Sequence, residues 1–162
     1  MSTSRRVEPR DVAAVVAMVH DLAAYERAPD ECTLTAEQLH AALFGEAPAL
    51  FGHVVEGPAG DPVGFALWFL NYSTWDGVHG IYLEDLYVVP EQRGAGHGRA
   101  LLAALAGLCV ARGYSRLTWW VLDWNTPSIG FYRSLGAQPM DEWTTFRLSG
   151  DALASLGSAA PG

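Results

Sequence analysis

The chain has 162 residues, a formal net charge of −8, ten arginines and no lysine. This length suits one domain with a buried core, and the composition, 50% hydrophobic and 17% charged, argues against disorder. An acidic protein repels nucleic acid phosphates and favours cationic partners, so we expect no nucleic acid partner. Residues 1–10 lack an apolar signal sequence, and no apolar run could span a membrane, so we expect no membrane partner and a cytoplasmic location.

The first half of the chain predicts two helices and a hairpin. Asp11 precedes apolar residues spaced along one helical face, so it is the expected N-cap of a helix ending near residues 25–27. Residues 35–38 have a capping-box sequence, which predicts a second helix through Leu43. The strands predicted in this half are Ser2–Arg6, Leu50–Glu56 and Val63–Tyr72, and the turn 57–62 joins the last two into a hairpin.

The second half predicts strands that alternate with helices. In chain order we expect a loop at 73–80, a strand at 81–89, a glycine-rich turn at 93–98, a helix ending at 112–113, a strand at 116–122, a helix at 127–135 and a strand at 143–148. This order predicts one mixed α/β domain, residues 1–150, with one central sheet. Residues 151–162 form a small, polar tail, and the stretch from Ser149 onward is expected to fray.

The glycine-rich turn runs Arg93-Gly94-Ala95-Gly96-His97-Gly98 between an apolar strand and a helix. Its glycines allow close approach of a ligand, and the first helical amides lack internal partners, so the turn suits a pyrophosphate. A Walker loop needs a lysine, which the chain lacks, and a Rossmann fingerprint spaces its glycines differently. Two interpretations remain: the Arg-x-x-Gly-x-Gly turn of coenzyme A-dependent acetyltransferases, and a connection that binds nothing.

Four stretches in the right order resemble the GNAT acetyltransferase superfamily, and within it the spermidine/spermine and thialysine acetyltransferase group. They are residues 21–26, 82–88, 93–98 and 124–132. The resemblance implies a GNAT fold, with one mixed, mostly antiparallel twisted sheet, about four flanking helices and splayed central strands at a cofactor cleft. It also implies acetyl-CoA as the cofactor, a small cationic amine as the acceptor, and a homodimer.

The resemblance also implies a set of cofactor-binding residues. The backbone of 86–88 would pair with the pantetheine arm, and the amide of Val88 or Leu86 would donate to the developing oxyanion. Tyr132 would be the general acid, because a phenol can protonate a departing thiolate. His97 is interpreted as a helix-start residue and not a catalyst. The cofactor-binding residues are Leu86, Tyr87, Val88, Arg93, Gly94, Ala95, Gly96, His97, Gly98, Arg99, Asn125, Ser128 and Tyr132.

Acidic and aromatic residues are the expected acceptor site, because carboxylates and ring faces attract an ammonium group. Glu84 and Asp85 are neighbours on a strand, so alternation predicts opposite faces and no shared proton. The resemblance indicates Glu84 as the group that deprotonates the amine, directly or through water. One of Trp119 and Trp120 should pack inside, and the other should border the acceptor. The resemblance adds Tyr25 and Glu26 at the end of the first helix, and Glu142, so that the expected acceptor-binding residues are Tyr25, Glu26, Glu84, Asp85, Trp119, Trp120 and Glu142.

Two other functions stay open. The protein could be a GNAT enzyme for a different acceptor, such as an amino acid, an antibiotic amine or a protein N-terminus. It could also be a coenzyme A-binding sensor without catalysis, although binding alone needs neither Tyr132 nor Glu84. The five histidines show no ligand spacing, so we predict no metal site.

Overall fold

The computed structural model describes residues 3–159 and divides the chain into two compact units, Met1–Leu122 (unit 1) and Asp123–Gly162 (unit 2). Unit 1 contains one five-stranded sheet in the order β1-β2-β3-β4-β5, in which only the β4–β5 pair is parallel. The predicted mixed, mostly antiparallel sheet is therefore confirmed. The elements of unit 1 are β1 (Ser4–Arg6), α1 (Val12–Tyr25), α2 (Ala36–Phe44), β2 (Phe51–Glu56), β3 (Pro62–Ser73), β4 (Val78–Val88), α3 (His97–Arg112) and β5 (Leu117–Thr118).

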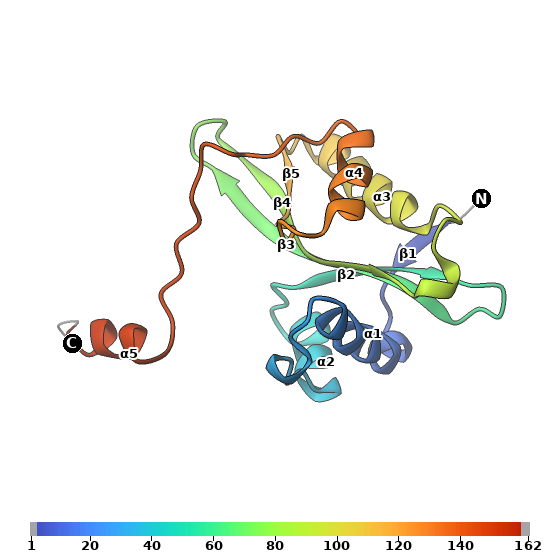
Figure 1. Cartoon of the computed structure of the whole chain (residues 1–162), viewed down its shortest axis with the longest axis horizontal. Coiled ribbons are helices and arrows are strands. Elements are labelled where there is room, and N and C mark those ends of the chain that lie inside the picture. The colour runs from blue at the N-terminus through green and yellow to red at the C-terminus, as the bar shows by residue number, and fades with distance from the viewer. Residues whose placement is uncertain (1–2, 160–162) are drawn as a thin grey trace. The chain divides into compact units, whose positions relative to one another are not determined.

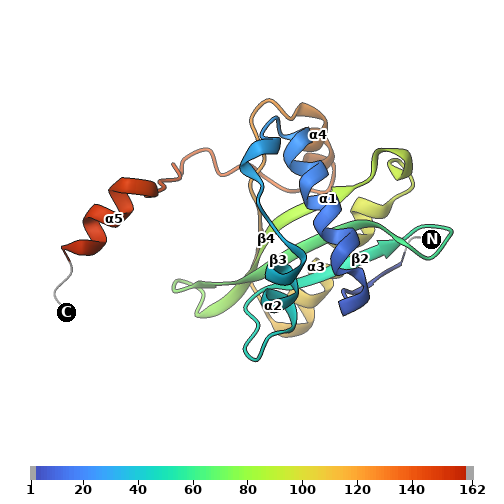
Figure 2. The same ribbon diagram turned by 90° about the horizontal axis from the view of Figure 1, so that it is seen from below.

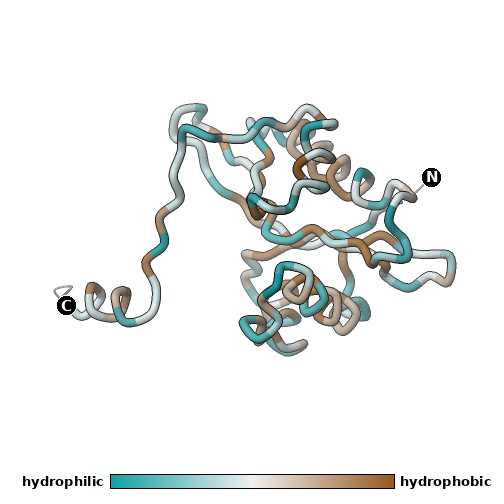
Figure 3. The backbone as a smooth tube through the Cα atoms, in the orientation of Figure 1, coloured by the Kyte–Doolittle hydropathy of each residue, from teal (hydrophilic) through white to brown (hydrophobic). Residues whose placement is uncertain are grey.

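Helices cover both faces of this sheet (Figure 1). Helices α1 and α2 lie together on one face, and Figure 2 shows them in front of the strands, with α3 behind. The core under α1 and α2 takes Val54 from β2, Phe65 and Leu67 from β3, and Tyr87 from β4. The residues that alternate with these, including Trp68 and Leu83, are buried on the opposite face. Figure 3 shows hydrophobic stretches along the strands at the centre of unit 1.

The N-terminal predictions agree with the structure except at one cap. Thr35 and Gln38 form the predicted capping box, with both reciprocal hydrogen bonds present. Asp11 occupies the N-cap position of α1, but its side chain does not cap that helix. Its carboxylate instead accepts from the Glu8 amide and from Arg5, because a buried carboxylate needs a cation as well as amides. Ser2, the predicted start of the first strand, lies outside the described residues.

Of the last two strand predictions, the first is confirmed only in part and the second is wrong. The strand predicted at 116–122 is reduced to two residues, Leu117–Thr118, because beyond them the chain no longer pairs with β4. Residues 143–148, all described, form no strand, although Trp143 and Phe146 favour one. A strand requires a neighbour for its backbone groups, and no described strand pairs with this segment. Trp143 and Phe146 are 67% and 93% exposed.

Unit 2 contains two helices, α4 (Thr126–Ser134) and α5 (Gly150–Ser158). The first confirms the predicted helix, shifted by one residue, with Pro127 in its first turn. The second replaces the predicted frayed tail through Ser158, because alanine and leucine in this stretch favour helix. The division of the chain into a domain of residues 1–150 and a tail stays a prediction.

Candidate active site

The glycine-rich turn adopts the backbone that its sequence predicts. A short 3-10 helix, Pro90–Gln92, follows β4, and α3 begins at His97. Gly94 and Gly96 have φ angles of 81° and 85°, in the left-handed region that favours glycine. Gly96 is the N-cap of α3, and having no side chain it leaves the first helical amides uncapped. The turn can therefore present backbone donors and the positive end of the helix dipole to an anion.

Strand β4 has a free edge beside this turn. Its parallel pairing with β5 covers only Ile81 and Tyr82, so residues 83–88 run on without a described partner on that side. The amide of Val89 donates to Val63 of β3 at 2.9 Å. Because backbone groups alternate along a strand, the N–H and C=O of Val88 and Leu86 point to the free edge. The predicted splay of the strands is thus present, and it exposes the two amides expected to contact a thioester.

A β-bulge interrupts β4 at two neighbouring acidic residues. Leu83 pairs with Trp68 and Asp85 with Leu67, so Glu84 is an extra residue between the pairs. Simple alternation fails at a bulge, and the charge of Glu84 acts on Asp85. Burial, followed by the charges of Glu84 and Glu26, raises the pKa of Asp85 to about 6. The prediction that Glu84 and Asp85 lie on opposite faces assumed regular alternation, which the bulge interrupts, so it stays a prediction.

Glu26 adds a third acidic group from a distant part of the sequence. It follows Tyr25 at the C-terminal end of α1. Desolvation of its carboxyl group raises the pKa of Glu26, even though the residue as a whole is exposed. Its charge is one of those that raise the pKa of Asp85. We call Glu26, Glu84 and Asp85 the carboxylate cluster. These three residues give negative potential between the end of α1 and the bulge of β4.

Aromatic rings lie along β4 near its pairing with β5. Phe69 and Tyr82 are paired residues, with ring centroids 5.0 Å apart, and Trp120 meets the Tyr82 ring edge-on at 5.8 Å. Trp120 is 59% exposed, whereas Trp119 is half-buried. This difference favours Trp120 as the tryptophan that borders an acceptor and Trp119 as the one that packs.

Arg93 lies against two tyrosines. Its guanidinium carbon is 5.4 Å from the ring centroid of Tyr25 and 5.4 Å from that of Tyr87. Its Nε donates to the carbonyl oxygen of Val88 at 2.9 Å. The sequence placed Arg93 in a cofactor motif, but no pattern in it indicated these contacts. They depend on how the end of α1 packs against β4.

The remaining predicted residues lie in unit 2. The side chain of Asn125 caps α4 by accepting from the amide of Ser128 at 3.4 Å, so these two residues have a structural role within the unit. Tyr132 lies in α4, where its ring contacts Phe131. Glu142 is exposed in the segment between α4 and α5.

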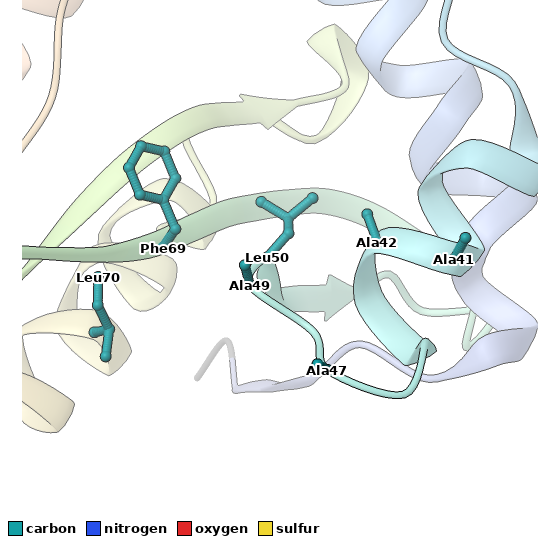
Figure 4. Close-up of a pocket in the computed structure, with 7 residues that line it drawn as sticks. All are labelled: Ala41, Ala42, Ala47, Ala49, Leu50, Phe69 and Leu70. Atoms are coloured by element: carbon teal, nitrogen blue, oxygen red, sulfur yellow. The ribbon is translucent and has the colours of Figure 1, made fainter. Parts of the chain in front are cut away.

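One apolar hollow lies in unit 1 and shares Phe69 with the aromatic rings described above. It has a volume of about 540 Å³ between α2, the loop that follows it and β3 (Figure 4). None of its lining residues is charged, and none belongs to the predicted site, so it does not suit an anion or an ammonium group. The residues are Ala41, Ala42, Ala47, Ala49, Leu50, Phe69 and Leu70. Across residues 3–159 there is no group of three or more potential metal-ligating side chains, and no helix there could span a membrane.

Comparison with known proteins identifies the family. Residues 15–137 match the model of the acetyltransferase (GNAT) family. The chain is 37% identical to thialysine N-epsilon-acetyltransferase of Bos taurus, over 94% of this chain and 95% of that protein. It is 30% identical to L-ornithine N5-acetyltransferase of Arabidopsis thaliana, over 96% of this chain and 87% of that protein.

Solved structures agree with the fold. An integron cassette protein from V. cholerae superposes with a TM-score of 0.81 at 23% identity, over 98% of both chains. An aminoglycoside acetyltransferase from an uncultured soil metagenomic sample gives a TM-score of 0.75 at 16% identity, over 91% of this chain and 95% of that one. With the family match over most of its length, the chain belongs to the GNAT family and is an N-acetyltransferase.

Proposed function

We propose that this enzyme transfers the acetyl group of acetyl-CoA to the amine of a small cationic acceptor, such as a polyamine, a diamine or a thialysine-like amino acid. The observation that supports this most is the carboxylate cluster beside the free edge of β4. Negative charge with aromatic neighbours attracts an ammonium group. The names of the relatives, which act on thialysine and ornithine, point to the same class of acceptor.

The residues of unit 1 fit a pyrophosphate and an extended arm. The turn Gly94–Arg99 would hold the pyrophosphate on its amides, and the backbone of Leu86–Val88 would pair with the pantetheine. Ala95, His97 and Gly98 belong to this turn, Arg93 directly precedes it, and Asn125 and Ser128 stay predicted contacts in unit 2. Two left-handed glycines and two outward-facing strand residues support this assignment.

The proposed chemistry divides among four groups. Bound acetyl-CoA supplies the thioester that the amine attacks. A carboxylate of the cluster takes the proton that the amine loses. Glu84 is the predicted base, and it acts directly or through water. The amide of Val88 or Leu86 donates to the carbonyl oxygen as it gains charge. Tyr132 gives its proton to the sulfur as the C–S bond breaks, while Tyr25, Trp120 and Glu142 line the acceptor.

Release of free coenzyme A tests this proposal. Acetyl-CoA would be supplied with spermidine, spermine, putrescine, thialysine, ornithine, lysine and neutral amino acids, for the wild type and for Tyr132→Phe. We expect turnover with cationic amines and a loss of about 100-fold in kcat for Tyr132→Phe, the usual effect of losing a general acid. Turnover with neutral amines alone would contradict the acceptor class. Tight acetyl-CoA binding without any turnover would favour a sensor.

We also propose a homodimer and a cytoplasmic location. Exposed apolar residues at the C-terminal end support the dimer, because a monomer rarely exposes so many large apolar side chains in one segment. They are Trp143, Phe146, Leu148, Leu153 and Leu156. Both cysteines are free thiols, which suits a reducing compartment. Analytical ultracentrifugation tests the dimer, and a mass of one chain at micromolar concentration would contradict it.

A further inference from the structure

The side chain of Arg93 connects three parts of the proposed site. It belongs to the glycine-rich turn, its Nε binds the Val88 carbonyl on the free edge of β4, and its guanidinium lies against Tyr25 at the end of α1. Tyr87, the second ring, projects from β4 into the core under α1. The Arg93 side chain therefore connects the glycine-rich turn with the free edge of β4 and with the end of α1, next to Glu26.

The contacts on Arg93 use its shape as well as its charge. A guanidinium is flat and can lie against rings while its Nε–H donates in a fixed direction. A lysine ammonium keeps the charge but cannot make both contacts in this way. The Val88 carbonyl that Arg93 holds shares its residue with an amide proposed to face the thioester. A shift of Arg93 would therefore move that amide and the end of α1 together.

We propose that Arg93 is a positioning residue, whose side chain fixes the free edge of β4 relative to the end of α1, and that it does not act as a ligand for the cofactor phosphates. This inference rests on the proposed function. In this arrangement the phosphates are bound by the backbone of the turn. Arg93 sets the distance between the amine, which the carboxylate cluster attracts, and the thioester, which lies along Leu86–Val88. A change in that distance would lower the rate of acetyl transfer more than the affinity for the cofactor.

The experiment compares Arg93→Lys with the wild type on two thioesters, acetyl-CoA and S-acetylpantetheine, which has no phosphate. We expect kcat/KM for the amine to fall about 30-fold with both thioesters, as a misplaced reacting group would cause. The KM for acetyl-CoA should change by less than about threefold. A loss seen with acetyl-CoA but absent with S-acetylpantetheine would make Arg93 a phosphate ligand and overturn the proposal.

A binding measurement keeps this test independent of turnover. Calorimetry with coenzyme A at two salt concentrations should give Arg93→Lys and the wild type affinities within about threefold and the same salt dependence, since no phosphate contact is altered. Arg93→Gln should likewise bind coenzyme A within about threefold of the wild type at the higher salt concentration, where long-range attraction is screened, and a larger loss there would overturn the proposal. If the wild type binds coenzyme A but turns over no amine, the proposed function fails, while these affinities still decide the role of Arg93.

Two further variants separate positioning from general damage. Arg112→Lys is the matched control, because Arg112 lies 5.9 Å from the ring centroid of Tyr114, at the other end of α3. It should behave as the wild type. Tyr25→Leu removes one of the two rings, and should reproduce the loss seen in Arg93→Lys. The kcat/KM of the double variant should be at most about twofold below that of either single variant, because both substitutions disrupt the same set of contacts. Fully multiplicative losses would contradict the shared role.

Discussion

Asp85 lies opposite Leu67 while Leu83 lies opposite Trp68, so the strand pair has three residues of β4 facing two of β3. The extra residue is Glu84, and its charge adds to burial in raising the pKa of Asp85. The bulge therefore places a carboxylate where the fold disfavours its charge. A group held in this way is typical of sites that transfer protons or bind cations.

Replacing Asp85 by asparagine should stabilise the protein at neutral pH. The pKa of Asp85 is about 6 in the folded chain, because of burial and the charges of Glu84 and Glu26, and it is lower in the unfolded chain. Stability from this group is therefore greatest at low pH and falls as pH rises to about 6. Asp85→Asn should raise the free energy of unfolding at pH 7 by about 1–2 kcal/mol, reduced from the full shift because Asp85 is partly exposed.

Urea unfolding between pH 4 and pH 8 checks this. The gain from Asp85→Asn should disappear below about pH 4, where both states bind the proton. Asp61→Asn is the control, since Asp61 is exposed in the β2–β3 turn and should show no such pH dependence. A variant that is less stable than the wild type at pH 7, or equally more stable at every pH, would contradict the environment described for Asp85.

The buried His53 should have the opposite effect in the same pH range. The Nε1–H of Trp68 donates to His53 Nδ1 at 3.1 Å, and both side chains are buried. Burial, helped by the charge of Arg6, lowers the pKa of His53 to about 4. Its stability contribution is therefore complete above the unfolded pKa and is lost as pH falls toward 4, by up to about 2–3 kcal/mol.

His53→Gln tests this contribution, because glutamine can still accept from Trp68 but does not titrate. Between pH 6.5 and pH 4 the variant should lose less stability than the wild type. Urea unfolding, monitored by tryptophan fluorescence, measures this loss. Since Asp85 acts with opposite sign over part of this range, the difference between variant and wild type is the relevant quantity. His40→Gln, at an exposed position, is the control. Equal acid sensitivity in all three proteins would exclude His53 as the cause.

Local rules predicted the parts of the structure that depend on a few neighbouring residues. The capping box at Thr35 and the tight glycine turn, in which Gly94 and Gly96 prove to be left-handed, follow from backbone chemistry within one turn. The bulge at Glu84 could not be predicted, because register depends on both strands of a pair. The contacts of Arg93 with Tyr25 were equally inaccessible, since they join residues far apart in the sequence. Residues 143–148 show the same limit, because strand propensity supplies no partner strand.

The Arg5–Asp11 pair should be a major contributor to stability. Arg5 donates two hydrogen bonds to the carboxylate of Asp11, at 2.7 and 3.0 Å, and Asp11 is only 2% exposed. Burial alone would raise the pKa of Asp11, but the hydrogen bonds from Arg5 and the Glu8 amide outweigh it and lower the pKa. Stability from Asp11 is therefore present above its unfolded pKa and is lost in acid.

Asp11→Asn should lower the free energy of unfolding by about 3 kcal/mol, as breaking a buried ion pair does. Urea unfolding at pH 7 measures this. Arg10→Gln is the control, because the Arg10–Glu8 pair is exposed and should contribute less than about 0.5 kcal/mol. Similar losses in the two variants would mean that the Arg5–Asp11 geometry carries no special stability.

Gly96→Asp separates charge from backbone strain in the proposed anion turn. A Cβ on Gly96 would meet no atom within 4 Å, so substitution there is opposed by its φ of 85° and not by crowding. Gly96→Ala should therefore lose about 1–2 kcal/mol of stability, from the left-handed backbone alone. Gly96→Asp adds a negative charge beside the proposed pyrophosphate site, and should weaken coenzyme A binding roughly tenfold or more beyond the alanine variant.

Gly113→Asp is the matched control for this prediction. Gly113 also has a left-handed backbone, with a φ of 68°, and open space for a Cβ, but it lies at the opposite end of α3. It should lose similar stability and keep wild-type affinity for coenzyme A in calorimetry. If Gly96→Asp binds coenzyme A as tightly as Gly113→Asp does, the cofactor phosphates do not bind near residue 96. The start of α3 would then be only a connection between β4 and the helix, and the cofactor would have to be sought elsewhere.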